Sequence, residues 1–186
     1  MKRIFDITMS LVLLAALAVP MLVIAAIVRL TSRGPALYLS DRVGRDNVIF
    51  KMFKFRTMRT DTPAVATHLL DRPDAYVTDI GKFLRRTSLD ELPQLLNILK
   101  GDMSFVGPRP ALFNQYDLIE LRTGKGVHTL VTGLTGWAQI NGRDDLSIPV
   151  KVEFDEYYLK NRTFWLDIKI LWRTVFKVAQ SEGVKH

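Results

Sequence analysis

The feature that most constrains this chain is an uncharged run of 22 residues, 7–28, close to its N-terminus. A straight helix of that length is roughly 33 Å long, at about 1.5 Å per residue, and can cross the apolar part of a bilayer. Pro20 lies near the middle of the run, where it removes a backbone hydrogen bond and tends to kink a helix. The run therefore predicts a membrane-associated helix with a break at Pro20.

Basic residues lie on both sides of this run: Lys2 and Arg3 precede it, and Arg29 and Arg33 follow it. A spanning helix usually has its Lys/Arg excess at the cytoplasmic end, so basic residues at both ends favour a helix that enters the membrane and returns. Two alternatives stay open. An ordinary spanning anchor tolerates a proline, and the basic start with an Ala-Leu-Ala triplet at 16–18 is typical of a cleaved signal peptide.

The net charge of +7 is concentrated in the first third of the chain. Residues 1–60 hold ten Lys or Arg and three Asp, whereas the remainder holds sixteen basic and sixteen acidic residues. Positive charge beside an apolar run indicates an anionic membrane surface or phosphate-bearing ligands, and makes nucleic acid a weak candidate. The chain has no cysteine, which excludes disulfides, Cys-ligated metals and a thiol nucleophile.

Length and turn signals predict two parts. At 186 residues the chain is a little longer than one typical domain, and a turn-forming stretch at 32–35 follows the apolar run. We expect a re-entrant membrane helix-break-helix over residues 1–33 and one further domain over residues 34–186. The fold class is α+β, with a small, mostly helical domain that also has short strands and amphipathic helices at the membrane interface.

Period-two and helical patterns predict the elements of this domain. In residues 53–58, Phe53 and Phe55 fall on one face of a strand, and Lys54 and Arg56 on the other, so two cations project together. Further patterns predict a loop over 60–79, an interrupted helix over 81–99, and an ordered loop over 133–149 that Leu134, Trp137 and Ile140 anchor.

The last element, over residues 164–180, is predicted to be an amphipathic helix. Apolar and aromatic residues recur at helical spacing beside a basic row; they are Trp165, Ile168, Trp172, Val175 and Phe176, and the row is Lys169, Arg173 and Lys177. Aromatic rings beside cations suit the bilayer interface. The alternative is a helix whose aromatic side packs in the core and whose basic edge is solvated.

The densest group of reactive side chains lies at residues 85–93. A structural explanation is a capping box, in which Ser88 and Glu91 cap a helix start. A functional explanation starts from Asp90, a carboxylate next to two arginines at a helix start, which would stay ionised and face a phosphate site. Asp can also attack phosphorus to give an acyl phosphate.

Two further groups suit phosphate and nucleotide binding. Arg109 lies between two prolines that restrict its backbone, and its guanidinium can bind phosphate oxygens in a bidentate manner. Residues 133–143 offer glycines for close backbone approach and side chains for a nucleotide-sugar and its phosphate: Trp137, Gln139, Asn141 and Arg143. The three histidines are scattered, which makes a His-ligated zinc site improbable.

Three long motifs follow one another along the chain: KFRTM at 54–58, TSLDELPQLLNILKGDMSFVGPRP at 87–110 and GLTGWAQINGRDD at 133–145. Together they resemble the small monotopic phosphoglycosyl transferases of bacteria, the catalytic core of the bacterial sugar transferase family. The likeness covers nearly the whole chain. Several motifs in the correct order are far more specific than any one of them.

The resemblance implies a membrane-embedded enzyme at the cytoplasmic face of the bacterial inner membrane. Such an enzyme moves a sugar 1-phosphate from a UDP-sugar to a polyprenyl phosphate, usually undecaprenyl phosphate. UMP is released and a polyprenyl diphosphosugar forms, which begins the assembly of a surface glycan or glycoconjugate. The family works by a ping-pong route through a covalent aspartyl phosphosugar.

The resemblance also implies roles for single residues. Asp90 matches the attacking Asp, and Glu91 matches the Glu that assists proton transfer or positions the acceptor. Mg²⁺ is the implied cofactor, held by Asp90 and substrate phosphate through hard oxygen ligands. The other matched positions are Lys54, Arg85 and Arg109 around the phosphates, and Asp167, an acid of the C-terminal helix with a secondary role.

The chain departs from the family pattern at Val19. The family often has Ser before the proline, with a hydroxyl that bonds to the carbonyl freed by the proline. Val cannot supply that bond, so the hairpin is less well specified than the active site.

The alternative function is a non-enzymatic membrane module whose basic first third binds anionic lipid while the acids only cap helices. The sequence leaves open which UDP-sugar is used, the glycan pathway and the oligomeric state, a homo-oligomer included. Sugar selectivity is expected to depend on residues 60–79 and 142–149.

Overall fold

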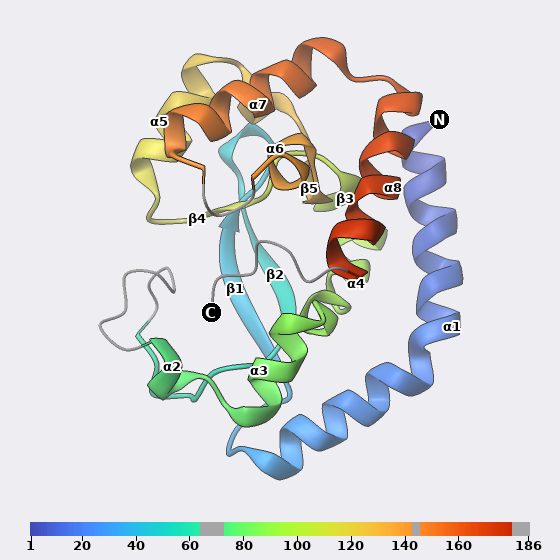
Figure 1. Cartoon of the computed structure of the whole chain (residues 1–186), viewed down its shortest axis with the longest axis vertical. Coiled ribbons are helices and arrows are strands. Elements are labelled where there is room, and N and C mark those ends of the chain that lie inside the picture. The colour runs from blue at the N-terminus through green and yellow to red at the C-terminus, as the bar shows by residue number, and fades with distance from the viewer. Residues whose placement is uncertain (64–72, 143–145, 180–186) are drawn as a thin grey trace.

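The protein combines helices with two small sheets (Figure 1). The computed structural model describes residues 1–63, 73–142 and 146–179. The strands are β1 (Leu37–Val43), β2 (Ile49–Phe55), β3 (Met103–Val106), β4 (Ala111–Leu112) and β5 (Thr132–Thr135). One sheet has the order β2-β1-β4, and a parallel pair, β3-β5, forms the other. This mixture of helices and short strands confirms the expected α+β class.

The uncharged run forms most of α1 (Lys2–Thr31), a single helix of 30 residues. Pro20 lies inside α1, and Figure 1 shows that α1 bends part-way along its length instead of ending there. The predicted break is therefore a bend, because a proline removes one backbone hydrogen bond while the others persist. Of the helices that the structure describes, α1 is long and apolar enough to cross a bilayer, and its Val19 and Leu22 are each 70% exposed.

Polar residues in the first turns of α1 bind the rest of the protein. Asp6 is buried, and its Oδ1 accepts hydrogen bonds from Ser104 Oγ and Phe105 N of β3, both at 3.2 Å. Arg3 donates to the backbone carbonyls of residues 98–99 at 2.5 and 2.7 Å. The basic start of α1 therefore makes contacts within the protein, in addition to preceding an apolar helix.

Arg56 binds the residues at the other end of α1, in contrast to the sequence prediction. Its Nη2 donates to Ser32 O at 2.8 Å and to Ser32 Oγ at 2.6 Å, and its Nη1 donates to Pro35 O. β2 ends at Phe55, so strand alternation no longer sets the direction of the next side chain. The prediction that Lys54 and Arg56 project together is wrong for this reason.

β1 and β2 form an antiparallel hairpin in which Tyr38 pairs with Lys54. Directly opposed residues share a face of a sheet, and so do alternate residues of one strand. Tyr38, Ser40, Arg42 and Lys54 therefore lie on one face of the hairpin. The face carries two cations, at opposite ends of β1.

The helix expected over residues 81–99 is interrupted, as predicted. A short α2 (Pro73–Tyr76) is followed by α3 (Asp79–Arg86), one turn of 3₁₀ helix, η3 (Leu89–Glu91), and α4 (Gln94–Lys100). Pro93 immediately precedes α4. The interruption lies between two helices that pack against α1, so it holds residues 88–93 in a fixed place.

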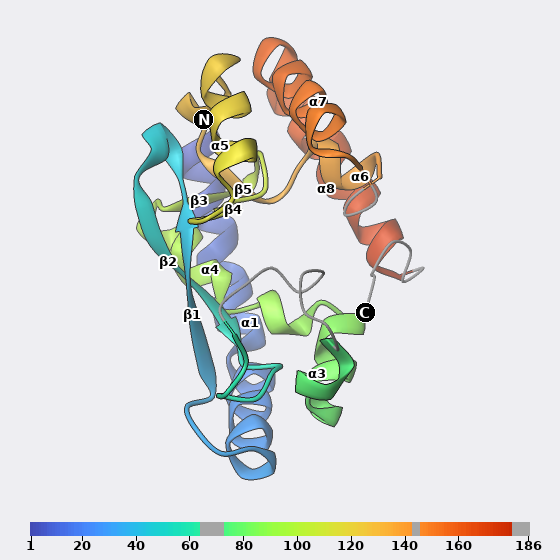
Figure 2. The ribbon, with the colours of Figure 1, turned by 90° about the vertical axis from the view of Figure 1, so that its left-hand side faces the viewer.

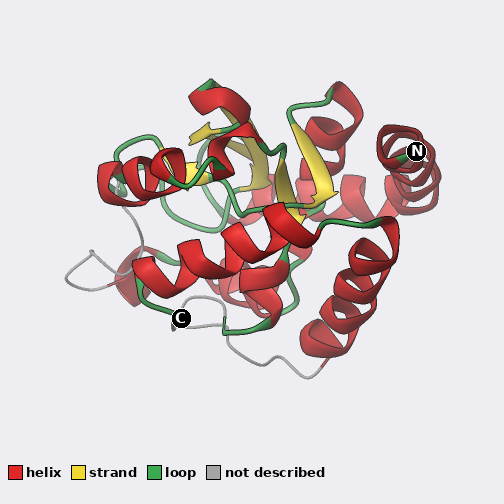
Figure 3. Ribbon diagram, turned by 90° about the horizontal axis from the view of Figure 1, so that it is seen from above, coloured by secondary structure: helices red, strands yellow, loops and turns green. Residues whose placement is uncertain are grey.

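The remaining elements are α5 (Tyr116–Gly124), η4 (Val127–Thr129), α6 (Trp137–Ile140), α7 (Ile148–Asn161) and α8 (Phe164–Ala179). Residues 133–142 therefore include the end of β5 and all of α6, whereas the sequence predicted an ordered loop. The three predicted anchors, Leu134, Trp137 and Ile140, do pack in or against the main core. Figure 2 shows the β1–β2 hairpin on one side of the molecule, and α7 and α8 on the other. From above, α7 and α8 run in different directions across a short connection (Figure 3).

α8 leaves much of its aromatic side exposed. Trp165 is 78% and Trp172 66% exposed, whereas Ile170 is fully buried. The alternative in which the aromatic side packs in the core is therefore wrong, because the buried side of α8 is the one around Ile170. The first turn of α8 contacts α1 through Phe164 and Phe5, whose ring centroids lie 5.8 Å apart.

Candidate active site

The interruption between α3 and α4 places two adjacent carboxylates in one turn. Ser88 adopts a left-handed conformation (φ 56°), which turns the chain into η3. Its side chain makes no capping hydrogen bond, so the capping-box explanation of Ser88 and Glu91 is wrong. Asp90 is only 7% exposed. The two acids thus lie in a tight turn between helices and do not form the regular first turn of a helix.

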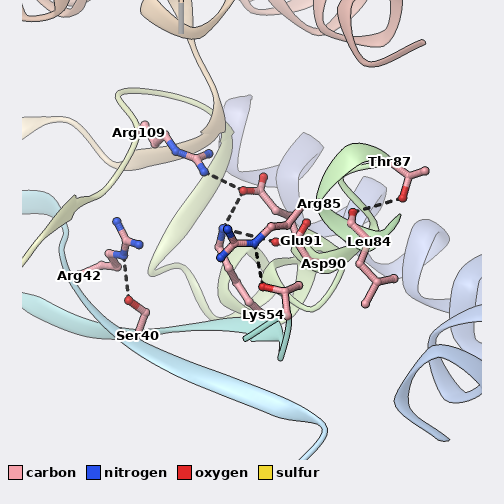
Figure 4. A network of polar contacts seen from close by, with 10 residues as sticks. Ser40, Arg42, Lys54, Leu84, Arg85, Thr87, Asp90, Glu91 and Arg109 are labelled. Carbon is pink, nitrogen blue, oxygen red and sulfur yellow. Dashed lines mark hydrogen bonds and ion pairs between the residues drawn. The ribbon is translucent and has the colours of Figure 1, made fainter. Parts of the chain in front are cut away.

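Glu91 is held by two cations from distant parts of the chain (Figure 4). Its Oε1 accepts from Lys54 Nζ of β2 at 2.8 Å and from Arg109 Nη2 at 2.8 Å. Burial alone would raise the pKa of Glu91, but Arg109 and Lys54 outweigh it and bring the pKa well below its usual range. Glu91 therefore stays ionised and fixes the positions of both cations.

Asp90 has a looser environment than Glu91. Its Oδ2 lies 3.8 Å from Lys54 Nζ. Burial raises the pKa of Asp90, against the opposing effect of Lys54, and the charge of Glu91 adds to the rise. Asp90 is thus a partly desolvated carboxylate, a state that favours reaction with an electrophile.

Arg85 lies on the Asp90 side of the site. Its Nε donates to Thr57 Oγ1 at 3.0 Å, and burial lowers its pKa while the charge of Asp90 opposes that shift. The structure therefore brings Lys54, Arg85 and Arg109 around the two carboxylates. Their binding of substrate phosphates stays a prediction.

The loop that carries Arg109 is fixed by its backbone. Gly107 N donates to Thr135 O at 2.8 Å, and Gly133 N donates to Pro108 O at 2.9 Å. A Cβ atom on Gly107 would lie 2.3 Å from a backbone oxygen, and one on Gly133 would lie 2.1 Å from Gly107 N. These glycines allow two backbone segments to meet, where the sequence had suggested close approach to a ligand.

A buried ion pair supports the same loop from behind. Arg122 of α5 pairs with Asp155 of α7 at 2.6 Å, and Arg122 Nη1 donates to Arg109 O at 2.8 Å. Both side chains of the pair are almost fully buried. α5 and α7 thereby hold the backbone of Arg109 in place.

Arg42 is a cation of this site that sequence reasoning missed. It lies on the same face of the hairpin as Lys54, and its charge interacts with those of Arg109 and Glu91. Ser40 and Arg42 are two residues apart, which places them on one face of a strand. The sequence does not show that Lys54 lies on the same face, because this depends on the register of β1 with β2.

Two of the other predicted site residues, Trp137 and Asn141, make contacts within the protein. Trp137 stacks on Tyr157 with ring centroids 5.3 Å apart, and Asn141 Nδ2 donates to Trp137 O at 2.7 Å. The amide of Gln139 is buried without a hydrogen-bond partner among the described residues. The proposed role of these three side chains at a nucleotide-sugar stays a prediction, and Arg143 lies outside the described residues.

Asp167 lies away from the carboxylate pair. It accepts hydrogen bonds from Lys2 Nζ and from the Tyr158 hydroxyl, both at 2.6 Å. These contacts join α1, α7 and α8 at one point. The secondary role expected for Asp167 stays a prediction.

An apolar cavity of about 260 Å³ opens beside the carboxylates. Its walls come from α1, α4, β3, β5, α6 and α8 and include Leu13, Leu17, Leu95, Phe105, Gln139 and Leu171. Ser88, Glu91 and Arg109 line it as well. The cavity therefore suits a ligand with an apolar body and an anionic end.

The site is a carboxylate pair ringed by cations beside an apolar cavity, which suits anionic, partly apolar ligands, and the exposed apolar helix α1 fits membrane association. Sequence comparison agrees with this description. Residues 1–181 match the sequence model of a family described as bacterial sugar transferase. The chain belongs to this family.

Three relatives are 38–43% identical to this chain. An uncharacterized sugar transferase of Bacillus subtilis, EpsL, is 43% identical over 188 residues, which cover all of this chain and 91% of EpsL. The UDP-glucose:undecaprenyl-phosphate glucose-1-phosphate transferase of Escherichia coli is 42% identical over 95% of this chain and 40% of its own length. The undecaprenyl-phosphate galactose phosphotransferase of Salmonella typhimurium is 38% identical over 98% and 41%. The chain thus spans less than half of the two longer relatives.

Proposed function

We propose that this protein transfers a sugar 1-phosphate from a UDP-sugar to undecaprenyl phosphate, releasing UMP and beginning the assembly of a surface glycan or glycoconjugate. The observation that carries the proposal is the position of Asp90 and Glu91, ringed by Lys54, Arg85 and Arg109 at the apolar cavity. The names of two relatives, which specify undecaprenyl phosphate and a hexose phosphate, support it.

In the first step, an Asp90 Oδ attacks the phosphorus that bears the sugar. The bond from this phosphorus to the bridging oxygen breaks, its electron pair leaves with UMP, and Asp90 carries the sugar phosphate as an acyl phosphate. Burial disfavours the charged form of Asp90, so its carboxylate is less strongly solvated than one in water. Lys54 and Arg85 lie close enough to stabilise the negative charge on the transferred phosphate.

In the second step, an oxygen of the acceptor phosphate attacks the same phosphorus. The acyl phosphate bond breaks, and Asp90 returns as a free carboxylate. The cavity supports this step, since its apolar walls can hold the first part of a polyprenyl chain while its Arg109 end meets the phosphate. Glu91 keeps Lys54 and Arg109 in place through both steps, which makes it a positioning group.

Mg²⁺ fits the donor set of this site. Within the parts of the chain that the structure describes, no three His or acidic side chains form a cluster. Mg²⁺ needs none, because it is often bound by one or two carboxylates together with substrate phosphates and water. Glu91 is already bonded to two cations, so Asp90 is the carboxylate that would hold the ion. When bound, Mg²⁺ would supply neutralisation of charge on the phosphates.

We place the protein at the cytoplasmic face of the bacterial inner membrane. The exposed apolar surface of α1 and its bend support a monotopic hairpin that enters the bilayer and returns. The exposed aromatic side of α8 supports contact with lipid at the interface. UDP-sugars are cytoplasmic metabolites, in agreement with a site on that face.

The proposal is tested by UMP release. Purified full-length protein in detergent is incubated with Mg²⁺, undecaprenyl phosphate and a panel of UDP-sugars, and we expect at least one donor to release UMP. The alternative, a lipid-binding module, predicts strong binding to anionic vesicles and no change of thermal stability with any UDP-sugar. That result, with no UMP across the panel, would reject the enzyme.

Asp90→Asn tests the covalent step. We expect turnover to fall by several orders of magnitude, because the nucleophile is lost. We also expect the phosphosugar adduct, seen as a mass increase of the wild-type protein in the absence of acceptor, to disappear. Asp79→Asn, at a fully exposed acid of α3, is the control and should leave both unchanged. Near-normal turnover of Asp90→Asn would exclude the aspartyl intermediate.

A further inference from the structure

Arg42 carries a charge that no acid of the described residues neutralises directly. Its Nε donates to Ser40 Oγ at 3.0 Å, and its Nη1 donates to Pro110 O at 3.3 Å, so both acceptors are neutral. No carboxylate in the described part of the chain lies within 4.0 Å of its guanidinium, the distance of an ion pair. Glu91 is bonded instead to Lys54 and Arg109.

A second cation lies close to Arg42. Burial lowers the pKa of Arg42 to about 10, and the charge of Arg109 adds to the effect. The side chain still stays protonated at neutral pH. A partly buried cation beside another cation is unfavourable in the free protein, and an anion bound by both would remove that cost.

The positions of the charged groups along the site indicate which anion Arg42 and Arg109 bind together. Lys54 lies beside Asp90 and Glu91, and Arg109 binds Glu91. Arg42 lies four residues along β1 from the partner of Lys54, about 14 Å at 3.4 Å per residue. The charge of Arg42 interacts with those of Arg109 and Glu91, whereas the cations that act most on Asp90 are Lys54, Arg85 and Arg109. Arg42 is therefore at the end of the site far from the nucleophile.

The apolar cavity is on another side of Arg109. Arg109 and Glu91 line the cavity, and Arg42 does not. A ligand that enters through the cavity thus meets Arg109 first. Figure 4 shows the guanidinium groups of Arg42 and Arg109 on the same side of the carboxylate pair, with Arg42 coming from the sheet.

We propose that Arg42 and Arg109 form the subsite for the nucleotide-linked phosphate of the donor, the phosphate that leaves as part of UMP. This inference rests on the proposed function. When Asp90 bonds to the sugar-linked phosphorus, the electron pair of the broken bond passes to the oxygen of UMP. Negative charge grows on that phosphate at the end opposite Asp90, where Arg42 can bind it. The acceptor phosphate, which enters from the cavity, has no need of Arg42.

The test is the affinity for UMP, which needs no turnover. UMP is titrated into full-length protein in detergent with Mg²⁺, and binding is followed by calorimetry. We expect Arg42→Gln to weaken UMP binding by about tenfold or more, as for loss of a charged hydrogen bond to phosphate. Arg45→Gln, at an exposed arginine of the same hairpin that pairs with Asp46, should bind UMP like the wild type.

Steady-state kinetics distinguishes an effect on binding of the donor from an effect on binding of the acceptor. In Arg42→Gln we expect KM for the UDP-sugar to rise while KM for undecaprenyl phosphate stays within twofold. UMP affinity within twofold of the wild type, in a variant with a normal thermal unfolding transition, would overturn the inference. If Arg42→Gln fails to fold, the UMP affinity of Arg42→Lys is measured instead. We expect weaker UMP binding in this variant too, because Lys keeps the charge but loses the bidentate geometry.

The two proposals fail in different ways. A wild-type protein that binds UMP but releases none from any donor would reject the proposed function. A wild-type protein that turns over, together with an Arg42→Gln variant of unchanged UMP affinity, would reject only the role of Arg42.

Discussion

Asp90 and Glu91 are neighbours in sequence, but their surroundings push their pKa values in opposite directions. Two cations within hydrogen-bond distance lower the pKa of Glu91, and burial raises that of Asp90. Such a separation assigns different roles to two acids of one site. A carboxylate with a lowered pKa is a weak base, so the structure favours Glu91 as the group that positions Lys54 and Arg109 over a role in proton transfer.

Lys54→Gln should move the acid limb of the pH profile to higher pH. Only the ionised Asp90 can attack, so activity rises as the pH rises through the pKa of Asp90. The charge of Lys54 lowers that pKa, and its removal therefore raises it. The measurement is the pH dependence of UMP release in the first turnover.

The matched control is Lys51→Gln. Lys51 belongs to the same strand but pairs with Asp41 on the outer face of the hairpin, where it is 59% exposed. Its pH profile should coincide with that of the wild type. An acid limb of Lys54→Gln that stays in place or moves to lower pH would contradict the assignment of Asp90.

At the level of elements, the position of Arg109 depends on parts of the fold that never touch the carboxylates. The parallel pair β3-β5 holds the loop 107–110 by backbone hydrogen bonds, and α5 and α7 hold it through Arg122. Arg122 and Asp155 are both nearly inaccessible to water, and burial raises the pKa of Asp155 in spite of Arg122. Such a pair is sensitive to the loss of one partner.

Asp155→Asn should destabilise the protein by about 3 kcal/mol, because it leaves Arg122 as a buried charge without its counterion. Activity should fall as well, since Arg122 binds the carbonyl of Arg109. Chemical denaturation in detergent measures the first effect. Glu156→Gln, at the next position, removes a solvent-exposed pair with Lys125 and should have little effect. Equal stability of the two variants would contradict the supporting role of Asp155.

The whole molecule presents apolar surface on two helices, α1 and α8. Val19 and Leu22 of α1 and Trp165 and Trp172 of α8 are all at least 66% exposed. Lys2 and Asp167 join the first turns of the two helices at 2.6 Å. A lipid surface that covers α1 would therefore lie next to α8.

Single-tryptophan variants test this arrangement. The chain has three tryptophans, and replacing two at a time by Phe leaves one reporter. In vesicles with brominated lipids we expect strong quenching of Trp165 and Trp172. We expect weaker quenching of Trp137, which is partly buried where it stacks on Tyr157. Equal quenching of all three, or none, would show that α8 does not lie at the interface.

Local patterns predicted those features that neighbouring residues determine. The interruption before Pro93 and the rigid setting of Arg109 were predicted from prolines, and the structure has both. The direction of Arg56 was predicted wrongly, and the position of Arg42 at the site and the stacking of Trp137 were not predicted. Each depends on segments that are distant in sequence: the end of α1, the hairpin register and α7.

Lys54 and Arg56 are two residues apart, about 7 Å of extended chain. At one end of this segment Lys54 binds Glu91, and at the other Arg56 binds the carbonyls of Ser32 and Pro35. For a chain anchored through α1, covalent geometry therefore sets the height of the carboxylates above the membrane. With α1 in a membrane, a phosphate at the level of the lipid headgroups would be met at a fixed depth.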